Sequence, residues 1–525
     1  MPMEHFDVIV VGAGISGIGA AYHLQTLCPD RSYVILEGRE AMGGTWDLFR
    51  YPGIRSDSDM YTLGYAFRPW TEAKAIADGP SILNYVKQTA AEYGIDRRIR
   101  YRHRVTAAAW SSDEACWTVT ATGPGGEAVR FTCSFLFMCS GYYNYARGHA
   151  PEFAGREDFA GQVIHPQFWP DDLDCAGKRV VVIGSGATAV TLVPELARTA
   201  AHVTMLQRSP TYIVARPAED RFANWLRSKL PDKLAYGIVR WRNVLFGIWF
   251  YNLARRKPAK VKTRLIGMVR EELGPDFDVE THFTPRYNPW DQRLCLVPDG
   301  DLFAVLREGR ASVVTGQIDR FVPEGIRLQN GELLPADVIV TATGLELQVL
   351  SDVAFSVDGA PVDFAKTYNY KGMMFSGVPN LASAFGYTNA SWTLKADLTS
   401  LYVCRLLNAL RRKGMRQATP RVAGEDLQPV PFLDFTSGYV QRAIDRFPKQ
   451  GHRKPWKLNQ NYARDLMALK FGSIEREMEF SNPVTAQAQP VGDASSLQHG
   501  RAERESTSVE QPQPTRAASM AHHGP

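Results

Sequence analysis

The chain has 525 residues, a length that favours two or three domains over a single core. Hydrophobic residues make up 45% and charged residues 22% of the sequence, which is ordinary for a soluble globular protein. The formal net charge of +5 is too mild to indicate a nucleic-acid partner.

Cysteine usage and apolar runs narrow the class further. The seven cysteines are scattered and include no C-x-x-C pair, so the sequence predicts neither a disulfide framework nor a metal site. The chain enters a predicted strand within its first six residues, without the pattern of a signal peptide. No apolar run reaches the roughly 18 residues that a membrane span needs. We therefore expect a cytoplasmic protein.

The first predicted unit is a strand, a glycine-rich loop, a helix and a second strand. We expect strands over 6–11 and 32–37, with a helix over 18–27 between them. The loop before the helix has the sequence G-A-G-I-S-G and runs from Gly12 to Gly17. A loop of this pattern between a strand and a helix indicates dinucleotide binding.

Four residues of this unit have expected roles. Gly12 permits the tight turn, Gly14 lets a pyrophosphate approach the backbone, and Gly17 allows close packing of helix on strand. The amides at the helix N-terminus favour phosphates. Glu37 ends the second strand, where a carboxylate accepts hydrogen bonds from ribose hydroxyls and repels a 2′-phosphate. The first site therefore suits FAD or NAD and does not suit NADP.

A second unit of the same kind follows. We expect a strand over 179–183, a helix over 188–197 and a strand over 202–207. The loop after the first of these strands has the sequence G-S-G-A-T-A. Alanine in place of the third glycine is an accepted variant that keeps helix and strand close together. The repetition predicts two dinucleotide sites on one chain.

The residue at the ribose position differs between the two units. Arg208 lies 24 residues after Gly184, nearly where Glu37 stands relative to Gly12. A guanidinium there reverses the preference, because it pairs with a 2′-phosphate through two hydrogen bonds, and Ser209 adds a hydroxyl donor. We therefore expect NADPH in the second site. The loop residues expected to hold it are Gly184, Ser185, Gly186, Ala187, Thr188, Ala189 and Val190.

Short β segments after each unit predict an excursion that returns to the sheet. These segments are 117–121 and 131–138 in the first unit, and 313–315, 326–328 and 337–341 in the second. The excursions return at Ser140-Gly141 and at Gly344. The predicted fold class is therefore α/β, with two Rossmann-like dinucleotide-binding domains.

Residues 221–273 break the α/β rhythm and are expected to be helical. From Lys233 to Arg270 the chain has ten Lys or Arg residues and no Asp or Glu. The aromatic residues interleaved with these charges are Trp241, Phe246, Trp249, Phe250 and Tyr251. We favour a helical insertion whose aromatic residues pack on the domain and line a substrate tunnel. The alternative is peripheral membrane contact through 233–270, because basic residues attract anionic lipid and tryptophan favours the interface.

Longer motifs carry a resemblance to a known family. The spacer between the units contains Phe159-x-Gly161-x-x-x-His165-x-x-x-Trp169-Pro, and a glycine pair with a tryptophan, G-G-T-W, follows the ribose acid. The other motifs are GGTWDLFRYPGIRSD at 43–57, YNPWDQR at 287–293 and GYTNASW at 386–392. Together these segments resemble type I Baeyer–Villiger monooxygenases, and within them the subgroup that includes the ethionamide-activating enzyme. The resemblance covers about residues 5–480 and favours FAD in the first site.

The resemblance implies a reaction. Family members use NADPH to reduce FAD, the reduced flavin and O2 give a peroxyflavin, and its anion attacks a ketone carbonyl to yield an ester or lactone. Oxidation of sulfides and thioamides is an implied second activity. The peroxide must stay anionic and the oxyanion of the adduct must be stabilised, so a permanent cation is needed over the flavin. By resemblance this cation is Arg293, held in place by the carboxylate of Asp57.

The resemblance also implies cofactor contacts and a hinge. The implied flavin contacts are Ser16, Thr45, Trp46, Asp47, Leu48 and Val105. The implied contacts on the nicotinamide side are Arg55, Ser56 and Asp57. The linker residues Phe159, Gly161, His165 and Trp169 imply a hinge that couples cofactor binding to domain motion.

These assignments predict a discontinuous first domain. The expected parts are an FAD-binding domain over 1–150, a fingerprint linker over 151–175, an NADPH-binding domain over 176–340 with its helical insertion at about 218–285, the rest of the FAD-binding domain over 341–482, and a disordered tail over 483–525. The tail is rich in Gln, Ser, Ala and Pro and lacks apolar periodicity.

Three other functions remain open at this stage. A flavin-containing monooxygenase that oxygenates sulfur or nitrogen, without Baeyer–Villiger activity, would use the same cofactors. A flavin disulfide reductase would need a dithiol near the flavin, which the cysteine spacing does not provide. A non-catalytic FAD protein could use the basic segment as an adaptor surface. The sequence predicts no particular oligomeric state.

Overall fold

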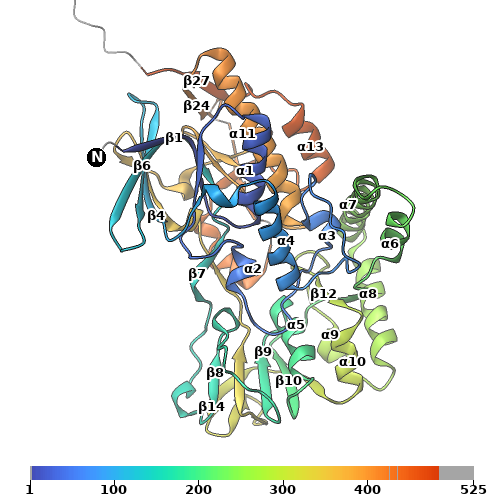
Figure 1. The fold of residues 1–525 in the computed structure, drawn as a ribbon. Helices are drawn as coiled ribbons and strands as arrows, with labels where there is room; N and C mark the ends of the chain where they lie inside the picture. Colours follow the sequence, from blue (N-terminus) through green and yellow to red (C-terminus); the bar gives the residue numbers. More distant parts are fainter. Residues whose placement is uncertain (1–2, 425, 434, 484–525) are drawn as a thin grey trace, which may run out of the picture. The chain divides into compact units, whose positions relative to one another are not determined.

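The computed structural model describes residues 3–424, 426–433 and 435–483 of the chain. The tail that was predicted to be disordered, 483–525, lies outside the described residues apart from Pro483. Figure 1 shows the ribbon, coloured along the sequence. The two main sheets, one mixed and one all parallel, have flanking helices, which confirms the predicted α/β class with two Rossmann-like units.

The first sheet has nine strands and is built around β1 (Glu4–Val11). This strand lies between β2 (Tyr33–Leu36) and β6 (Ala128–Met138), and both pairs are parallel. Successive β1 residues point to opposite faces, so Val8 joins the core under the helices and Ile9 joins the core on the other face. Burial on both faces is what the uninterrupted apolar run at the end of β1, residues 8–11, requires.

Strands from distant parts of the chain complete this sheet. Its order is β20-β19-β4-β5-β6-β1-β2-β3, with β23 paired to β6. These strands are β3 (Ile99–Arg100), β4 (Arg104–Ser111), β5 (Cys116–Thr122), β19 (Ala354–Val357), β20 (Ala360–Pro361) and β23 (Leu381–Ser383). The late strands β19 and β23 pair in parallel with β4 and β6, so the chain returns to the first sheet after it has built the second.

Helices cover one face of the first sheet. The helix α1 (Ile15–Leu27) packs against α11 (Trp392–Lys413), and α13 (Tyr462–Lys470) packs against α11 in turn. Figure 1 shows α1, α11 and α13 side by side, with α4 (Gly79–Glu92) next to them. Small residues of α1 such as Ala20 are fully buried, which lets the long helix α11 come close.

The second sheet has five strands, all parallel, in the order β13-β10-β9-β17-β8. These strands are β8 (Gln162–Ile164), β9 (Arg179–Ile183), β10 (His202–Gln207), β13 (Ala311–Thr315) and β17 (Val338–Thr341). The predicted segments 179–183 and 202–207 match β9 and β10, and α5 (Ala187–Leu196) is the helix predicted between them. The strand β8 belongs to the linker motif, so the linker is part of this sheet.

The predicted excursion in the second unit was wrong in part. We expected 313–315 and 337–341 to belong to it, yet β13 pairs with β10 and β17 lies between β8 and β9. Short apolar strands suit a parallel sheet that helices cover. The strand β17 is fully buried inside the sheet, and β13 is a partly buried strand at its edge. The excursion itself is the antiparallel sheet β14 (Ile318–Val322), β15 (Gly325–Leu328) and β16 (Leu333–Pro335).

Two extended segments connect the two sheets. The strand β7 (Tyr143–Gly148) leaves the first sheet, and β18 (Leu345–Leu347) leads back to it. They pair with each other in antiparallel fashion, between the two halves of the ribbon in Figure 1. This pair is one of the direct connections between the two sheets.

The segment 221–273 is helical, as predicted. Its helices are α6 (Arg221–Arg227), α7 (Asp232–Arg256) and α8 (Pro258–Leu273), followed by α9 (Val279–Phe283). The buried guanidinium of Arg240 on α7 donates to the carbonyl oxygens of Tyr61, at 2.7 Å, and Gly64, at 2.8 Å. These carbonyls lie at the end of α3 (Met60–Leu63), so Arg240 ties the insertion to the first domain.

The preferred interpretation had the five aromatic residues of this insertion pack on the domain and line a substrate tunnel. None of the five lines the large cavity, and three of them are exposed. Trp241, Phe246 and Trp249 are 41%, 43% and 57% exposed, and α7 contributes no residue to the lining of the large cavity described below. Only a narrow face of α7 is buried against the rest of the protein, and the opposite face is uncovered. Nowhere in 3–424, 426–433 or 435–483 is a helix both long and apolar enough to traverse a bilayer.

The remaining elements are short. They are α2 (Thr45–Leu48), α10 (Asp301–Arg307), α12 (Gly438–Gln441), β11 (Ile213–Arg216), β12 (Cys295–Pro298), β21 (Asn369–Tyr370), β22 (Met374–Phe375), β24 (Gln417–Pro420), β25 (Pro429–Pro431), β26 (Lys449–Gly451) and β27 (Met478–Ser481). Of these, α2 and the β12 end of the insertion position residues of the candidate site.

Candidate active site

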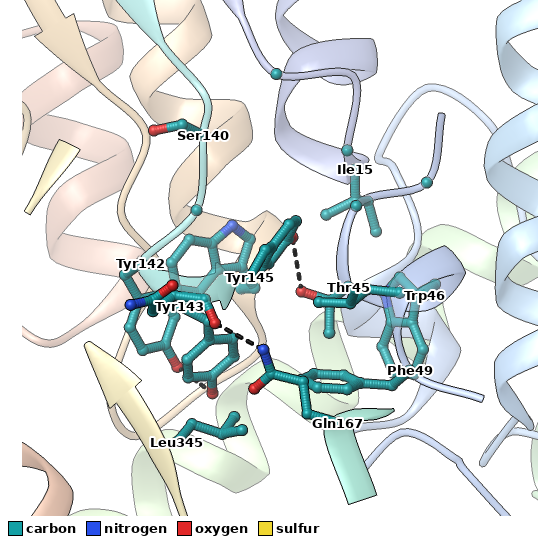
Figure 2. Close-up of a pocket in the computed structure, with 18 of the residues that line it drawn as sticks. Ile15, Thr45, Trp46, Phe49, Ser140, Tyr142, Tyr143, Tyr145, Gln167 and Leu345 are labelled. Atoms are coloured by element: carbon teal, nitrogen blue, oxygen red, sulfur yellow. Dashed lines mark hydrogen bonds between the residues drawn. The ribbon is translucent and has the colours of Figure 1, made fainter. Parts of the chain in front are cut away.

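A cavity of about 590 Å³ lies where the first sheet, the crossing strands and the second glycine loop meet. Its walls include the first glycine loop, the α2 turn and the β7 strand, and it reaches Thr188 of the second loop and Arg293. Figure 2 shows the aromatic side chains of β7 facing Thr45, Trp46 and Phe49 across this space. One cavity therefore gathers sequence motifs from distant parts of the chain, from Gly12 through Arg293 to Trp392.

The first glycine loop has the geometry that its sequence predicts. Gly12 adopts a φ of +103°, a conformation that L side chains rarely adopt. A Cβ on Gly17 would stand 1.9 Å from the carbonyl oxygen of Gly12. The helix α1 can therefore begin directly against the strand only because neither position has a side chain.

Both glycine loops lead into helix N-termini that are free to bind an anion. The helices α1 and α5 begin after Gly14 and Gly186, and neither has a side-chain cap or an acidic residue in its first turn. A Cβ on Gly186 would meet no atom within 4 Å, and one on Gly14 would meet only Gly44. Open space in front of uncapped amides fits the phosphates of a dinucleotide at each loop.

The acid of the first unit is held by the backbone. The amide nitrogens of Ala13 and Arg39 donate to the two carboxylate oxygens of Glu37, at 2.7 and 2.9 Å. Burial, with the side chain only 7% exposed, raises the pKa of Glu37, and these amide hydrogen bonds oppose the rise. The carboxylate is thus fixed at the end of β2 and lines the cavity, where ribose hydroxyls would reach it.

The turn after this acid supplies one wall of the cavity. Thr45, Trp46 and Leu48 line it, and the Thr45 hydroxyl lies 3.3 Å from the Tyr145 hydroxyl (Figure 2). Asp47 instead turns away and pairs with Arg39, with Nη2 and Oδ2 2.8 Å apart. Of the four residues expected to touch the flavin here, Asp47 holds the turn in shape while the other three face the cavity.

Arg293 and Asp57 meet at the cavity wall. Arg293 Nε lies 3.0 Å from Asp57 Oδ2, and its Nη2 donates to Asp57 Oδ1 at 3.3 Å. The Asp57 carboxylate raises the pKa of Arg293, while burial acts in the opposite direction. The side chains are 37% and 28% exposed, so the pair is accessible to a ligand in the cavity. The result is a fixed cation with a single carboxylate to orient it.

Tyrosines surround this cation, a feature that the sequence interpretation missed. The hydroxyls of Tyr142 and Tyr143 lie 2.8 Å apart (Figure 2), and both phenols interact electrostatically with Arg293. The ring of Tyr142 stacks on Trp392 at 4.9 Å, and the indole of Trp392 donates to Ser16 Oγ at 2.7 Å. Two consecutive tyrosines follow Ser140-Gly141 in the sequence. They could have indicated this feature, because the chain leaves the first sheet there and lines the same cavity as the first glycine loop.

Two other residues expected to contact the nicotinamide, Arg55 and Ser56, form hydrogen bonds with protein groups. The guanidinium of Arg55 pairs with both carboxylate oxygens of Asp301, one of them at 3.2 Å. Ser56 is 4% exposed, and its hydroxyl accepts a hydrogen bond from the Ser58 amide at 2.9 Å. Both residues line the cavity, but Asp301 on α10 was not foreseen as a partner of Arg55.

The ribose end of the second unit is open. Arg208 and Ser209 are exposed, and Arg208 makes no ion pair or hydrogen bond with its side chain in the described part of the chain. The hydroxyl of Ser185 donates to the Ser209 carbonyl at 3.2 Å and lies 2.9 Å from Thr211 Oγ1. These bonds fix the loop beside a cation that has no protein partner there, which suits a phosphate ligand.

The linker residues gather at the crossing strands. The amide of Gln167 donates to His165 Nδ1 at 3.2 Å, so His165 Nε2 carries the proton and donates to the Gly344 carbonyl at 3.2 Å. A Cβ on Gly148 would stand 2.0 Å from the imidazole. Burial lowers the pKa of His165. The neutral imidazole thus touches β7 at Gly148 and the residue directly before β18, Gly344.

The other expected residues have structural positions. Phe159 packs on Phe321 with ring centroids 6.4 Å apart, and a Cβ on Gly161 would stand 2.3 Å from the Asp337 carbonyl oxygen. Trp169 packs against the core of the second sheet. Val105 lies at an irregularity in the β4–β5 pairing and lines the cavity.

A cavity that joins two dinucleotide loops to a fixed cation defines the class as a two-dinucleotide flavin oxidoreductase. Family models agree: flavin-binding monooxygenase-like matches residues 74–261, and an NAD(P)-binding Rossmann-like domain matches residues 10–76. The second description names a nicotinamide nucleotide, although the matched residues hold the first glycine loop and Glu37.

Two similar proteins show the family to which this chain belongs. The FAD-containing monooxygenase EthA of Mycobacterium tuberculosis is 57% identical over 475 residues, which are 90% of this chain and 97% of EthA. EthA of Mycolicibacterium smegmatis is 55% identical over 475 residues, with 90% of this chain and 96% of EthA covered. The chain therefore belongs to the EthA family of FAD-containing monooxygenases.

A solved structure shares the fold. An oxidized steroid monooxygenase bound to NADP superposes with a TM-score of 0.70 and 21% identity, covering 91% of this chain and 100% of that chain. At this identity the similarity concerns the fold alone. The predicted cofactor pair, FAD with NADPH, agrees with these findings.

Proposed function

We propose that the chain is an NADPH- and O2-dependent monooxygenase that inserts oxygen beside a ketone carbonyl to give an ester or lactone. The observation that carries this proposal is the Arg293–Asp57 pair in a cavity reached by both glycine loops. Family membership supports the flavin and the oxygenation, and the fixed cation supports attack on a carbonyl.

In this proposal each glycine loop holds one cofactor. The loop from Gly12 to Gly17 holds the FAD pyrophosphate, and Glu37 accepts the ribose hydroxyls. The α2 turn and Val105 line the rest of the FAD site. The loop from Gly184 to Val190, with Arg208, Ser209, Arg55 and Ser56, holds NADPH.

The protein residues provide the electrostatics of the reaction. When bound and reduced, the isoalloxazine ring supplies the activation of O2. Arg293 cannot act as an acid at a working pH, so it leaves nearby anions deprotonated and stabilises negative charge that develops on the carbonyl oxygen. Asp57 holds the guanidinium in one orientation, and the stacked rings of Tyr142 and Trp392 limit the access of water.

Oxidation of sulfides and thioamides belongs to the same proposal as a second activity. A sulfide or thioamide sulfur is the nucleophile in its oxidation, whereas a ketone carbonyl is the electrophile. Oxidation of sulfur forms no carbonyl-derived oxyanion, so it does not need a fixed cation to stabilise one. The competing function is therefore an S- or N-oxygenating monooxygenase without activity on ketones. Arg293 and Asp57 favour the carbonyl reaction, since a structural ion pair would not need to line the cavity.

The cysteines argue against a disulfide reductase. All seven lie in the described part and are free thiols there. Cys28 donates to the carbonyl oxygen of Cys404 at 3.6 Å, but both residues are buried between α1 and α11 and do not line the cavity. Cys139 does line it, and burial raises the pKa of its thiol, which disfavours the reactive thiolate.

The test is product analysis with isotopically labelled oxygen. FAD-loaded enzyme is incubated with NADPH, ¹⁸O2 and, in separate reactions, a linear ketone, a cyclic ketone, an aryl ketone and an aryl methyl sulfide. The proposal expects an ester or lactone with one ¹⁸O atom from at least one ketone, formed in proportion to NADPH consumed. Sulfoxide from the sulfide with no ester from any ketone would establish the competing function.

A further inference from the structure

Exposed apolar side chains are concentrated on one segment of the insertion. Of the fifteen large hydrophobic residues that are exposed in the described part of the chain, eight lie between 222 and 249. These eight are Phe222, Trp225, Leu234, Ile238, Trp241, Leu245, Phe246 and Trp249. Scattered exposed apolar residues are ordinary, but a contiguous group of this size indicates an interaction surface.

Five of the eight form a stripe along α7. They are Leu234, Ile238, Trp241, Leu245 and Trp249, with spacings of four, three, four and four residues. This spacing places them on one face of the helix, over about 22 Å at a rise of about 1.5 Å per residue. The opposite face is buried against the first domain, with Tyr236, Val239 and Arg240 among its residues. We call these five residues the α7 stripe.

Basic residues lie beyond both ends of the α7 stripe. Lys229 and Lys233 precede it, and Arg256, Lys257 and Lys260 follow it. All five are exposed, and none of them pairs with a carboxylate in 3–424, 426–433 or 435–483. Between Asp220 and Glu271 the sequence has a single acidic residue, Asp232. The charge around the stripe is therefore strongly positive.

We propose that the α7 stripe and its basic flanks bind peripherally to an anionic lipid surface. A helix lying in the interface buries an apolar stripe at the level of the headgroups, and tryptophan and leucine are suited to that depth. Exposed lysine and arginine residues at both ends of the helix neutralise anionic headgroups. The inner face of α7 stays on the first domain, so binding requires no unfolding of the insertion.

A second copy of the chain is a poorer occupant of the same face. A two-fold interface would place the basic residues of one copy against those of its partner, with Asp232 as the sole acidic residue on the segment to compensate. Like charges at such an interface oppose association. An anionic surface offers the complementary charge to every basic residue of the patch at once.

The experiment is sedimentation of the full-length, FAD-loaded protein with vesicles. We expect binding to vesicles of phosphatidylcholine that contain about 30 mol% of the anionic lipid phosphatidylglycerol. Binding to pure phosphatidylcholine is expected to be at least about tenfold weaker, and 0.5 M NaCl is expected to weaken binding to the anionic vesicles, because salt screens the charges on a scale of about 4–5 Å.

Two variants separate the two parts of the patch. Leu245→Gln with Trp249→Gln removes apolar area, and binding to the anionic vesicles is expected to fall by about tenfold or more. Arg256→Ala, Lys257→Ala and Lys260→Ala together are expected to weaken it on the order of 100-fold, at about fivefold per basic residue.

Matched controls change exposed apolar and exposed basic residues elsewhere. Leu333→Gln with Val430→Gln replaces two apolar residues that are 43% and 40% exposed. Lys87→Ala, Arg97→Ala and Arg130→Ala remove three exposed basic residues. Both controls are expected to bind as the unmodified protein does, and every variant is expected to keep its flavin absorbance.

Three results would overturn the proposal. They are an absence of binding to anionic vesicles, equal weakening by the patch variants and their controls, and conversion of a dimer to a monomer by the α7 stripe variant in sedimentation velocity. The last result would assign the face to a second copy of the chain. None of them bears on oxygenation, which is measured separately.

Discussion

At the scale of single residues, the ribose ends of the two dinucleotide sites carry side chains of opposite charge. Glu37 is buried and held by two backbone amides, whereas Arg208 is exposed with no protein partner in the described part. A buried acid repels a 2′-phosphate, and a free guanidinium attracts one. We propose that these two residues set which cofactor enters which loop.

The Arg208→Ala substitution is expected to change the preference for the nicotinamide cofactor. A hydrogen bond to a charged group contributes about 1.5–3 kcal/mol, so kcat/KM for NADPH should fall by about 10- to 100-fold. The value for NADH should change little, because NADH lacks the phosphate. Steady-state kinetics with both cofactors measure the ratio. An unchanged ratio would show that Arg208 is only a solvated charge.

At the scale of elements, close approach of helix to strand explains the first loop. The α1 helix begins against the Gly12 carbonyl, where a side chain on Gly17 has no room, whereas Gly186 at the start of α5 faces open space. In this motif, Gly17 is therefore needed for the packing of helix on strand, whereas Gly186 leaves space for the ligand.

A matched pair of glycine substitutions tests this distinction. Gly17→Ala is expected to lower the free energy of unfolding by about 3 kcal/mol and to prevent FAD retention, because the helix must move away from the strand. Gly186→Ala is expected to leave the unfolding midpoint and the FAD content unchanged and to raise only the KM for NADPH. Thermal unfolding and flavin absorbance provide the comparison. Equal destabilisation by both substitutions would contradict it.

The contact of His165 with the connecting segments predicts how stability depends on pH. His165 accepts from the Gln167 amide and donates to Gly344, which requires the neutral imidazole. Its pKa is lowered by burial, so the unfolded chain binds the proton more readily than the folded one. Stability should therefore fall as the pH falls below about 6.5, the ordinary pKa of histidine.

The His165→Asn substitution isolates this contribution, because asparagine can still accept from the Gln167 amide. The unfolding midpoint of the variant should decline less between pH 7 and pH 5.5 than that of the unmodified protein. His149 and His282, whose pKa values burial also lowers, are present in both proteins and cancel. For the proposed hinge, turnover should fall while FAD remains bound. Complete loss of FAD would assign His165 to the flavin site instead.

The sequence predicted those elements whose pattern is local. The strands around both glycine loops and the helical nature of 221–273 follow from residue type and periodicity, and the structure has them at nearly the predicted positions. The segment 313–315 was misassigned because a short apolar strand looks the same in an excursion and in a parallel sheet. Only its partner strand, β10, distinguishes the two cases.

At the scale of the whole molecule, the candidate site depends on contacts that no local pattern encodes. The pairing of Arg293 with Asp57 was implied by family resemblance, and the structure has them 3.0 Å apart although 236 residues separate them. The surrounding tyrosines and the Arg55–Asp301 pair were missed, because the sequence does not reveal which loops the fold brings together. The exposed face of α7 could not be predicted either, since an amphipathic helix can turn its aromatic side inward or outward.

The proposed function rests on the charge of Arg293 within the assembled cavity. Arg293→Met keeps much of the volume of the side chain and removes its charge, whereas Arg293→Lys keeps the charge and loses the paired hydrogen bonds to Asp57. Loss of one electrostatic contact of this kind costs about 10²–10³ in rate.

The deciding measurement is therefore the rate of ester formation from a ketone relative to sulfoxide formation from a sulfide, in FAD-loaded Arg293→Met. We expect the ester rate to fall by at least about 100-fold, while the enzyme stays yellow and the sulfoxide rate falls much less. Ester formation at the rate of the unmodified enzyme would contradict the central role of Arg293.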